Sequence, residues 1–153
     1  MTVATDELRD RALLTDLVSR YAHAVDTRDI PGIVACFTAG AHVEFGGGAE
    51  VVEGHEGLTR FFEGALIRPM MGANGASTHL MTDVLVSVDG ETAHVETQAV
   101  AFLAAEGRDT VIVRGLRYSD VCVRDGHSWL VDRRMHRSLW QYEAPGGLLP
   151  SSP

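Results

Sequence analysis

The sequence predicts an α+β fold shaped as an open cone, in which three N-terminal helices pack on a strongly curved, mostly antiparallel sheet and enclose one apolar pocket. Three observations predict it. Apolar residues recur at helical spacing in the first part of the chain, strand-like segments follow from residue 77, and acid–glycine pairs separate those segments. The length of 153 residues suits one domain, so we expect a single domain over 1–153 with a flexible tail at 144–153.

The first predicted helix begins near Asp6 and ends near Asp26. Acidic residues in its first turn suit the positive end of the helix dipole. Its apolar positions lie three and four residues apart, which is the pattern of an amphipathic helix with one buried side. These positions are Leu14, Leu17, Val18, Tyr21, Ala22 and Val25.

Two further helices and a short strand are expected before residue 67. Asp29 is placed to cap a short second helix, whose early Pro31 needs no backbone donor. Residues 41–45 predict a short strand that ends at the glycines 46–48. Residues 54–66 predict a third helix. Its inward-facing side chains are expected to be Leu58, Phe61 and Phe62.

Four segments rich in valine, threonine and aromatic residues predict the sheet. They span residues 77–88, 92–105, 109–124 and 128–142. The pairs Asp89-Gly90, Glu106-Gly107 and Asp125-Gly126 are turn signals between them. Three successive hairpins predict an antiparallel meander, and strands of this length must twist strongly. Helices laid across such a sheet leave a pocket, and the tail is expected to be a loop near its mouth.

Composition excludes several classes of function. The net charge of −8 disfavours nucleic acid and anionic membranes as partners. All 13 basic residues are arginine, which excludes a Schiff-base lysine. No stretch approaches the roughly 20 apolar residues of a membrane span, and the acidic N-terminus lacks a signal sequence, so we expect a cytoplasmic protein.

No sequence motif calls for a metal or a cofactor. Cys36 and Cys122 lie far apart, so they form neither a redox pair nor a zinc ligand set. His55-Glu56 lacks the second histidine of a zincin motif. Calcium loops, phosphate-binding loops and nucleophile elbows are also missing from the sequence. We therefore expect no metal and no cofactor.

His79 and Asp26 are the candidate catalytic pair. His79 opens the first long strand, after a glycine-containing loop at 71–75, and Asp26 ends the first helix. A carboxylate there can receive an imidazole N–H, fix its tautomer and raise its basicity. The alternative is a capping aspartate and a core histidine. Tyr21, on the buried stripe, is a candidate donor or a core tyrosine, and it lies about 140° around the helix from Asp26.

The last strand offers the candidate anion-binding residues. Alternation places Arg134, His136 and Trp140 on one side and Arg133 and Arg137 on the other, unless a bulge intervenes. An arginine that reaches the pocket would bind an anionic or carbonyl group. Arg114 and Arg117 on the preceding strand are alternatives. The competing interpretation is that these arginines lie on the surface and balance cross-strand acids.

Several segments of the chain together resemble one known family. These are residues 17–26 followed by Asp29, residues 52–57, Thr78-His79, residues 118–120, and Trp129 with Arg134. On these residues the chain resembles the nuclear transport factor 2-like superfamily, in its SnoaL-like branch, from about residue 14 to 142. The enzymes that it resembles there are scytalone dehydratase, bile acid dehydratase and hexachlorocyclohexane dehydrochlorinase.

The resemblance implies roles for individual residues. In those enzymes a strand histidine supported by a helix-end aspartate removes a proton, and His79 and Asp26 match that pair. Tyr21 matches a helix tyrosine of the bile acid enzyme, and Arg134 matches an arginine of the dehydrochlorinase. We expect the remaining substrate contacts to come from Phe45, Leu58, Phe62, Arg117, His136 and Trp140.

The leading hypothesis is a cofactor-free lyase or isomerase that acts on a small hydrophobic, oxygenated molecule. The expected substrate is a steroid, polyketide or terpenoid intermediate, and dehydration is the first choice of reaction. A polyketide-type cyclase with the same base is an alternative, as are a non-catalytic small-molecule-binding domain and a small subunit of a ring-hydroxylating oxygenase. We expect a homodimer or homotrimer, because open sheet faces commonly pair with themselves.

Overall fold

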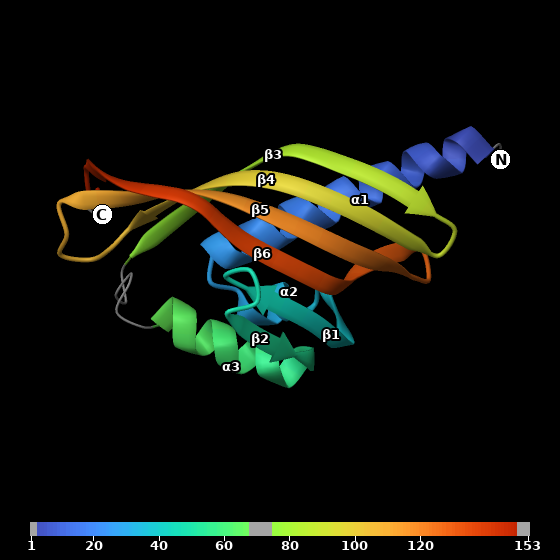
Figure 1. Cartoon of the computed structure of the whole chain (residues 1–153), viewed down its shortest axis with the longest axis horizontal. Coiled ribbons are helices and arrows are strands. Elements are labelled where there is room, and N and C mark those ends of the chain that lie inside the picture. The colour runs from blue at the N-terminus through green and yellow to red at the C-terminus, as the bar shows by residue number, and fades with distance from the viewer. Residues whose placement is uncertain (1–2, 68–74, 150–153) are drawn as a thin grey trace.

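The structure is a computed structural model that describes residues 3–67 and 75–149. The chain starts with a helix and contains three helices and six strands, and the last four strands are long (Figure 1). In chain order they are α1 (Val3–Asp26), α2 (Ile30–Val34), β1 (Phe37–Phe45), β2 (Glu50–Glu53), α3 (Gly54–Ile67), β3 (Ala76–Asp89), β4 (Thr92–Ala104), β5 (Thr110–Asp125) and β6 (Ser128–Pro145).

The strands form one mixed, curled sheet in the order β2-β1-β6-β5-β4-β3. All neighbouring strands are antiparallel except β1 and β6, which are parallel. Gly90, Gly107 and Gly126 adopt positive φ of 60°, 73° and 59° in the three hairpin turns, where glycine pays no steric cost. The predicted α+β fold with its antiparallel meander is therefore confirmed.

Helix α1 lies across one face of the long strands, whereas α2, α3, β1 and β2 gather together on one side of them (Figure 1). The stripe predicted from the sequence is buried: Leu14 and Leu17 are 0% and 2% exposed, and both join the core around Trp129 and Phe37. Asp29 caps α2 as expected, since its carboxylate accepts a hydrogen bond of 3.0 Å from the backbone N–H of Gly32.

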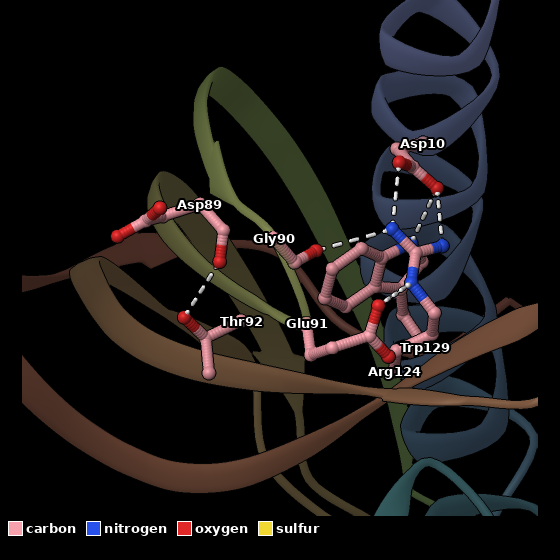
Figure 2. Close-up of polar contacts among 7 residues, drawn as sticks. All are labelled: Asp10, Asp89, Gly90, Glu91, Thr92, Arg124 and Trp129. Atoms are coloured by element: carbon pink, nitrogen blue, oxygen red, sulfur yellow. Dashed lines mark hydrogen bonds and ion pairs between the residues drawn. The ribbon is translucent and has the colours of Figure 1, made fainter.

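The N-terminal half of α1 is also tied to the sheet by a polar cluster (Figure 2). Both carboxylate oxygens of Asp10 accept hydrogen bonds of 2.9 Å from Arg124, and the indole N–H of Trp129 donates to Asp10 at 3.0 Å. The guanidinium of Arg124 also lies 4.4 Å from the Trp129 ring and donates to the carbonyl of Gly90. The cluster therefore joins α1 to two hairpin turns.

Three boundaries differ from the sequence prediction. Strand β1 begins at Phe37 rather than residue 41, because Phe37 already pairs with Val131 of β6. Strand β2 was not predicted; it folds back on β1 after the glycine turn. Ala144 and Pro145 were assigned to a flexible tail, but they pair with β5 and belong to β6. Residues 150–153 of that tail and most of the expected loop at 71–75 lie outside the described residues.

Two irregularities in β6 decide which side chains face α1. The pairing with β5 shifts between Gly115 and Leu116, and again between Val121 and Cys122. The first shift leaves Leu139 without a partner, since Ser138 pairs with Leu116 and Trp140 pairs with Gly115. A single unpaired residue reverses the facing of every residue beyond it.

No helix in the described part of the chain is long and apolar enough to cross a membrane.

Candidate active site

A cavity of about 170 Å³ lies between the end of α1, the aromatic side chains of β1 and α3, and the concave face of the long strands. Its apolar wall is formed by Val25, Phe45, Phe61, Phe62, Leu103 and Leu116. The ring centroids of Phe45 and Phe61 stack at 4.0 Å, and Phe62 meets both edge-on. The polar groups that face the cavity are Tyr21, Ser77, His79, Arg114, Tyr118 and His136.

Asp26 and His79 are joined by a short hydrogen bond at the wall of this cavity. The distance from His79 Nδ1 to Asp26 Oδ1 is 2.7 Å, and the two side chains are 10% and 21% exposed, histidine first. Asp26 also accepts a hydrogen bond of 2.8 Å from the backbone N–H of His79 and one of 2.7 Å from the hydroxyl of Ser77. Because a carboxylate only accepts, Nδ1 carries a proton, and in the neutral ring Nε2 then has the free lone pair.

The chain builds this contact by ending α1 beside the start of β3. Asp26 is the last residue of α1, and Ser77 and His79 alternate onto the same face of β3. Tyr21, five residues before Asp26, also lines the cavity. Tyr21 and Asp26 lie on different sides of the helix, as the sequence predicts, but the cavity extends around the helix end. Tyr21 lines the cavity directly, whereas Asp26 contacts His79, which lines it.

Arg134 lies behind the tyrosines rather than at the cavity wall. Its guanidinium forms two hydrogen bonds to Asp120, at 2.7 and 2.6 Å, and both residues are 3% exposed. It also lies 4.1 Å from the ring of Tyr21 and 4.9 Å from the ring of Tyr118. Arg134 does not line the cavity. The geometry is that of a buried ion pair that fixes the two rings from behind.

The two tyrosines stay protonated in this environment. Burial raises the pKa of Tyr21, and burial likewise raises the pKa of Tyr118, well above the ordinary phenol value; the nearby guanidinium of Arg134 only partly opposes both shifts. A phenol with a raised pKa remains a hydrogen-bond donor at every working pH. Both residues therefore line the cavity as neutral phenols.

His136 is a second histidine at the cavity wall, and it is neutral. Burial, with smaller contributions from the positive charges of Arg134 and Arg114, lowers its pKa to about 4. Its ring lies 5.2 Å from that of Tyr118 and 5.6 Å from that of Phe45. Its Nδ1 is buried and has no hydrogen-bond partner among the described residues.

Three expected pocket residues lie elsewhere. Trp140 is 49% exposed on the opposite, convex face, because the unpaired Leu139 reverses the alternation that began at Arg134. Arg117 is exposed on that same face, since its neighbours Leu116 and Tyr118 point into the cavity. Leu58 is fully buried in the core and does not line the cavity.

Sequence reasoning also missed cavity residues that the structure brings in. Tyr118 lines the wall. Arg114, which was offered together with Arg117 as an alternative to the arginines of the last strand, is the arginine of β5 that faces the cavity. Arg114, Leu116 and Tyr118 are two residues apart, so alternation along the strand predicts that their side chains point to the same face of the sheet. Alternation alone does not say whether that face is the cavity side. Ser77 was given no role in the sequence analysis, yet its hydroxyl donates a hydrogen bond to Asp26.

Metal-ligating side chains do not gather in this cavity. Within residues 3–67 and 75–149, no group of three or more histidine, cysteine, aspartate or glutamate side chains lies close enough together to hold a metal ion. Cys36 and Cys122 are both buried and unpaired, and burial raises the pKa of each thiol. Neither cysteine lines the cavity.

Comparison with known proteins gives a family match over most of the chain. The profile of a SnoaL-like domain matches residues 6–135. An uncharacterized protein of Mycobacterium tuberculosis is 26% identical over 138 residues, which cover 88% of this chain and 89% of that protein. A solved structure described as a putative aromatic ring hydroxylase from Novosphingobium aromaticivorans is 26% identical, with a TM-score of 0.78, and covers 90% of this chain and 94% of its own.

Two other solved structures share the fold at lower identity. The hexachlorocyclohexane dehydrochlorinase LinA-type3 from Novosphingobium barchaimii has a TM-score of 0.82 at 17% identity, and the match covers 96% of this chain and 99% of that one. A putative scytalone dehydratase from Novosphingobium aromaticivorans has a TM-score of 0.81 at 14% identity, covering 98% and 100%. At these identities the likeness establishes the fold.

Proposed function

The chain belongs to the SnoaL-like domain family, and we propose that it is a lyase that removes water from a small hydrophobic, oxygenated molecule, with His79 as the base. The observation that carries the proposal is the 2.7 Å hydrogen bond from His79 Nδ1 to Asp26 beside an apolar cavity. A base of this kind needs an oriented imidazole with one free nitrogen. Steroid, polyketide and terpenoid intermediates are the substrate classes that suit such a wall.

The reaction follows from the groups that face the cavity. His79 Nε2 takes a proton from the carbon next to the one that bears the hydroxyl group. The electrons of that C–H bond form a new C=C bond while the C–O bond on the neighbouring carbon breaks and its electron pair leaves with the oxygen. The imidazolium gives its proton to the departing oxygen, so that water leaves. Asp26 stabilises the transient imidazolium, while Tyr21 or Tyr118 donates a hydrogen bond to the oxygen that gains charge. The apolar wall strengthens both interactions.

Names of proteins with the same fold support this reaction class. A dehydrochlorinase and a dehydratase both carry out eliminations, and both are structural neighbours of this chain. Arg134, which matches an arginine of the dehydrochlorinase in the family resemblance, is engaged by Asp120 behind the tyrosines. We therefore assign Arg134 to positioning Tyr21 and Tyr118, and the donor role to those phenols.

The test compares turnover by wild-type protein and two variants. A panel of hydrophobic β-hydroxy ketones is screened, because their dehydration gives conjugated products that absorb in the ultraviolet. For a turned-over compound, His79→Ala is expected to lower kcat/KM by about 10²–10⁴-fold, and Asp26→Asn to lower it strongly as well, because an amide no longer stabilises an imidazolium. The matched control is His94→Ala, since His94 is exposed on β4 and its loss leaves the rate unchanged.

Two outcomes would contradict the proposal. If His79→Ala retains the wild-type rate, the base is another group. If wild-type protein binds compounds of the panel without converting any, and the variants bind them equally well, the chain is a binding domain.

A second candidate is a small subunit of a ring-hydroxylating oxygenase. It is favoured by the similarity to a structure described as a putative aromatic ring hydroxylase, at 26% identity. This function requires a large partner subunit that carries an iron–sulfur centre. Copurification of such a subunit from the native organism would favour it over the lyase.

A further inference from the structure

Arg114 lies in the same cross-strand row as His79. His79 on β3 pairs with Ala101 on β4, Ala101 pairs with Arg114 on β5, and Arg114 pairs with Gln141 on β6. The first three of these residues all line the cavity. Neighbouring strands lie about 4.8 Å apart, so the backbones of His79 and Arg114 are separated by roughly 10 Å. Only the methyl group of Ala101 stands between them on that face.

The guanidinium of Arg114 is oriented but not neutralised. Its Nε and Nη2 both donate to the side-chain oxygen of Gln141, at 2.9 and 2.7 Å. This contact fixes one edge of the guanidinium and leaves Nη1 available. By contrast, the other arginine near the cavity, Arg134, is matched by the carboxylate of Asp120. A neutral amide orients Arg114 without matching its charge.

None of the described residues that line the cavity is an aspartate or a glutamate, so none of them balances this charge. Asp26 is already engaged by His79 and Ser77. His136 adds no negative charge either, because it is a neutral imidazole. Arg114 is therefore a fixed positive charge at an apolar cavity, in a chain whose net charge is −8. The positive charge of Arg114 at this cavity favours an anionic ligand.

We infer that Arg114 binds a carboxylate of the substrate, so that the substrate is a hydrophobic acid whose reacting carbon and carboxylate lie on either side of Ala101. A carboxylate suits one arginine with one free donor edge, whereas a phosphate dianion would call for further cations at the wall. This inference rests on the proposed function, because it takes His79 as the group that faces the reacting carbon. To the proposed function it adds the class of substrate, a hydrophobic acid, and it identifies the carboxylate as the part of the substrate that does not react.

The test measures binding by calorimetric titration with phenylalkanoates of increasing chain length and with their primary amides. Each amide has the shape of its acid but no charge. Wild-type protein is expected to bind the best-fitting acid about ten- to hundredfold more tightly than its amide, which is the effect of a charge-assisted hydrogen bond. Arg114→Gln is expected to remove that preference, and Arg114→Lys to restore part of it.

The matched control is Arg117→Gln. Arg117 is on the same strand but points to the convex face, so its loss leaves the preference unchanged. The inference is overturned if wild-type protein binds neither probe class, if it binds acids and amides equally, or if Arg114→Gln keeps the preference. Failure of the lyase proposal is a separate result: it appears as unchanged turnover in His79→Ala, a variant that retains the acid preference.

Discussion

At the scale of single residues, the site depends on one carboxylate that accepts three hydrogen bonds. Asp26 holds the imidazole of His79, the backbone N–H of His79 and the hydroxyl of Ser77. The backbone contact fixes where β3 runs relative to the end of α1, and the side-chain contact fixes the ring. The orientation of the base is thus set at the junction between a helix and a strand.

His136 makes the stability of the fold depend on pH. Its pKa is lowered from 6.5 to about 4 by burial, with smaller effects from Arg134 and Arg114. Between these two values the unfolded chain binds a proton that the folded chain does not, so the free energy of unfolding falls as pH falls through this window. The full effect is on the order of 3 kcal/mol. Urea unfolding at pH 7 and at pH 4.5 measures it.

Replacing His136 by glutamine is expected to flatten this dependence, because the ionisable group is gone. The control is His94→Gln, at an exposed position of β4, which leaves the slope as in wild type. An unchanged slope in His136→Gln would show that another group takes up the proton.

At the scale of elements, the strands were predictable and the facing of β6 was not. Valine-rich segments and acid–glycine turns located all four long strands to within a few residues. The bulge at Leu139 has no marker in the sequence, and a single unpaired residue moved Trp140 to the convex face. Gly115 lies directly beneath the Trp140 indole, where a Cβ would meet ring atoms at 2.2 Å. The role of Gly115 in making room for Trp140 can be recognised only once the pairing of β5 with β6 is known.

The polar cluster at the N-terminal half of α1 is expected to stabilise the fold (Figure 2). Asp10 is 7% exposed and satisfies both Arg124 and the buried indole N–H of Trp129. Asp10→Ala leaves that N–H unpaired, so the free energy of unfolding should fall by about 2–3 kcal/mol. Urea unfolding measures the loss.

The matched control for the cluster is Asp16→Ala. Asp16 forms an exposed pair with Arg20 one turn away on the same helix, and such pairs contribute less than about 0.5 kcal/mol. Equal effects of the two substitutions would show that the Asp10 cluster adds no more than a surface ion pair.

At the scale of the whole molecule, sequence patterns predicted the class of fold and the meander, but not which strand pairs with the last strand of the meander. The parallel pairing of β1 with β6 joins segments about 90 residues apart, and no local pattern encodes such a contact. The pair His79 and Asp26 was proposed from the helix end and the strand start, but it needed the support of a family resemblance, because 53 residues separate the two. Local chemistry alone left it as one among many acid–histidine combinations.

Self-association remains a prediction, and the convex face is where we expect it. Leu80, Val100, Gly115 and Trp140 form one cross-strand row there, and Leu80, Trp140 and Tyr142 are about half exposed. An apolar row of this kind suits a contact between copies of the chain in a homodimer or homotrimer. Light scattering is expected to show an oligomer that Trp140→Glu dissociates, whereas Leu149→Glu, at an 89% exposed position, leaves it intact. A monomeric wild-type protein would contradict this.

The most direct test of the catalytic account is the protonation state of one ring. Nitrogen-15 NMR of the histidine side chains distinguishes the two neutral imidazole tautomers. With Asp26→Asn used to assign the signal, His79 is predicted to carry its proton on Nδ1 and to leave Nε2 unprotonated towards the cavity. A proton on Nε2 in the neutral ring would mean that His79 has no lone pair to offer a substrate, and the role of base would be lost.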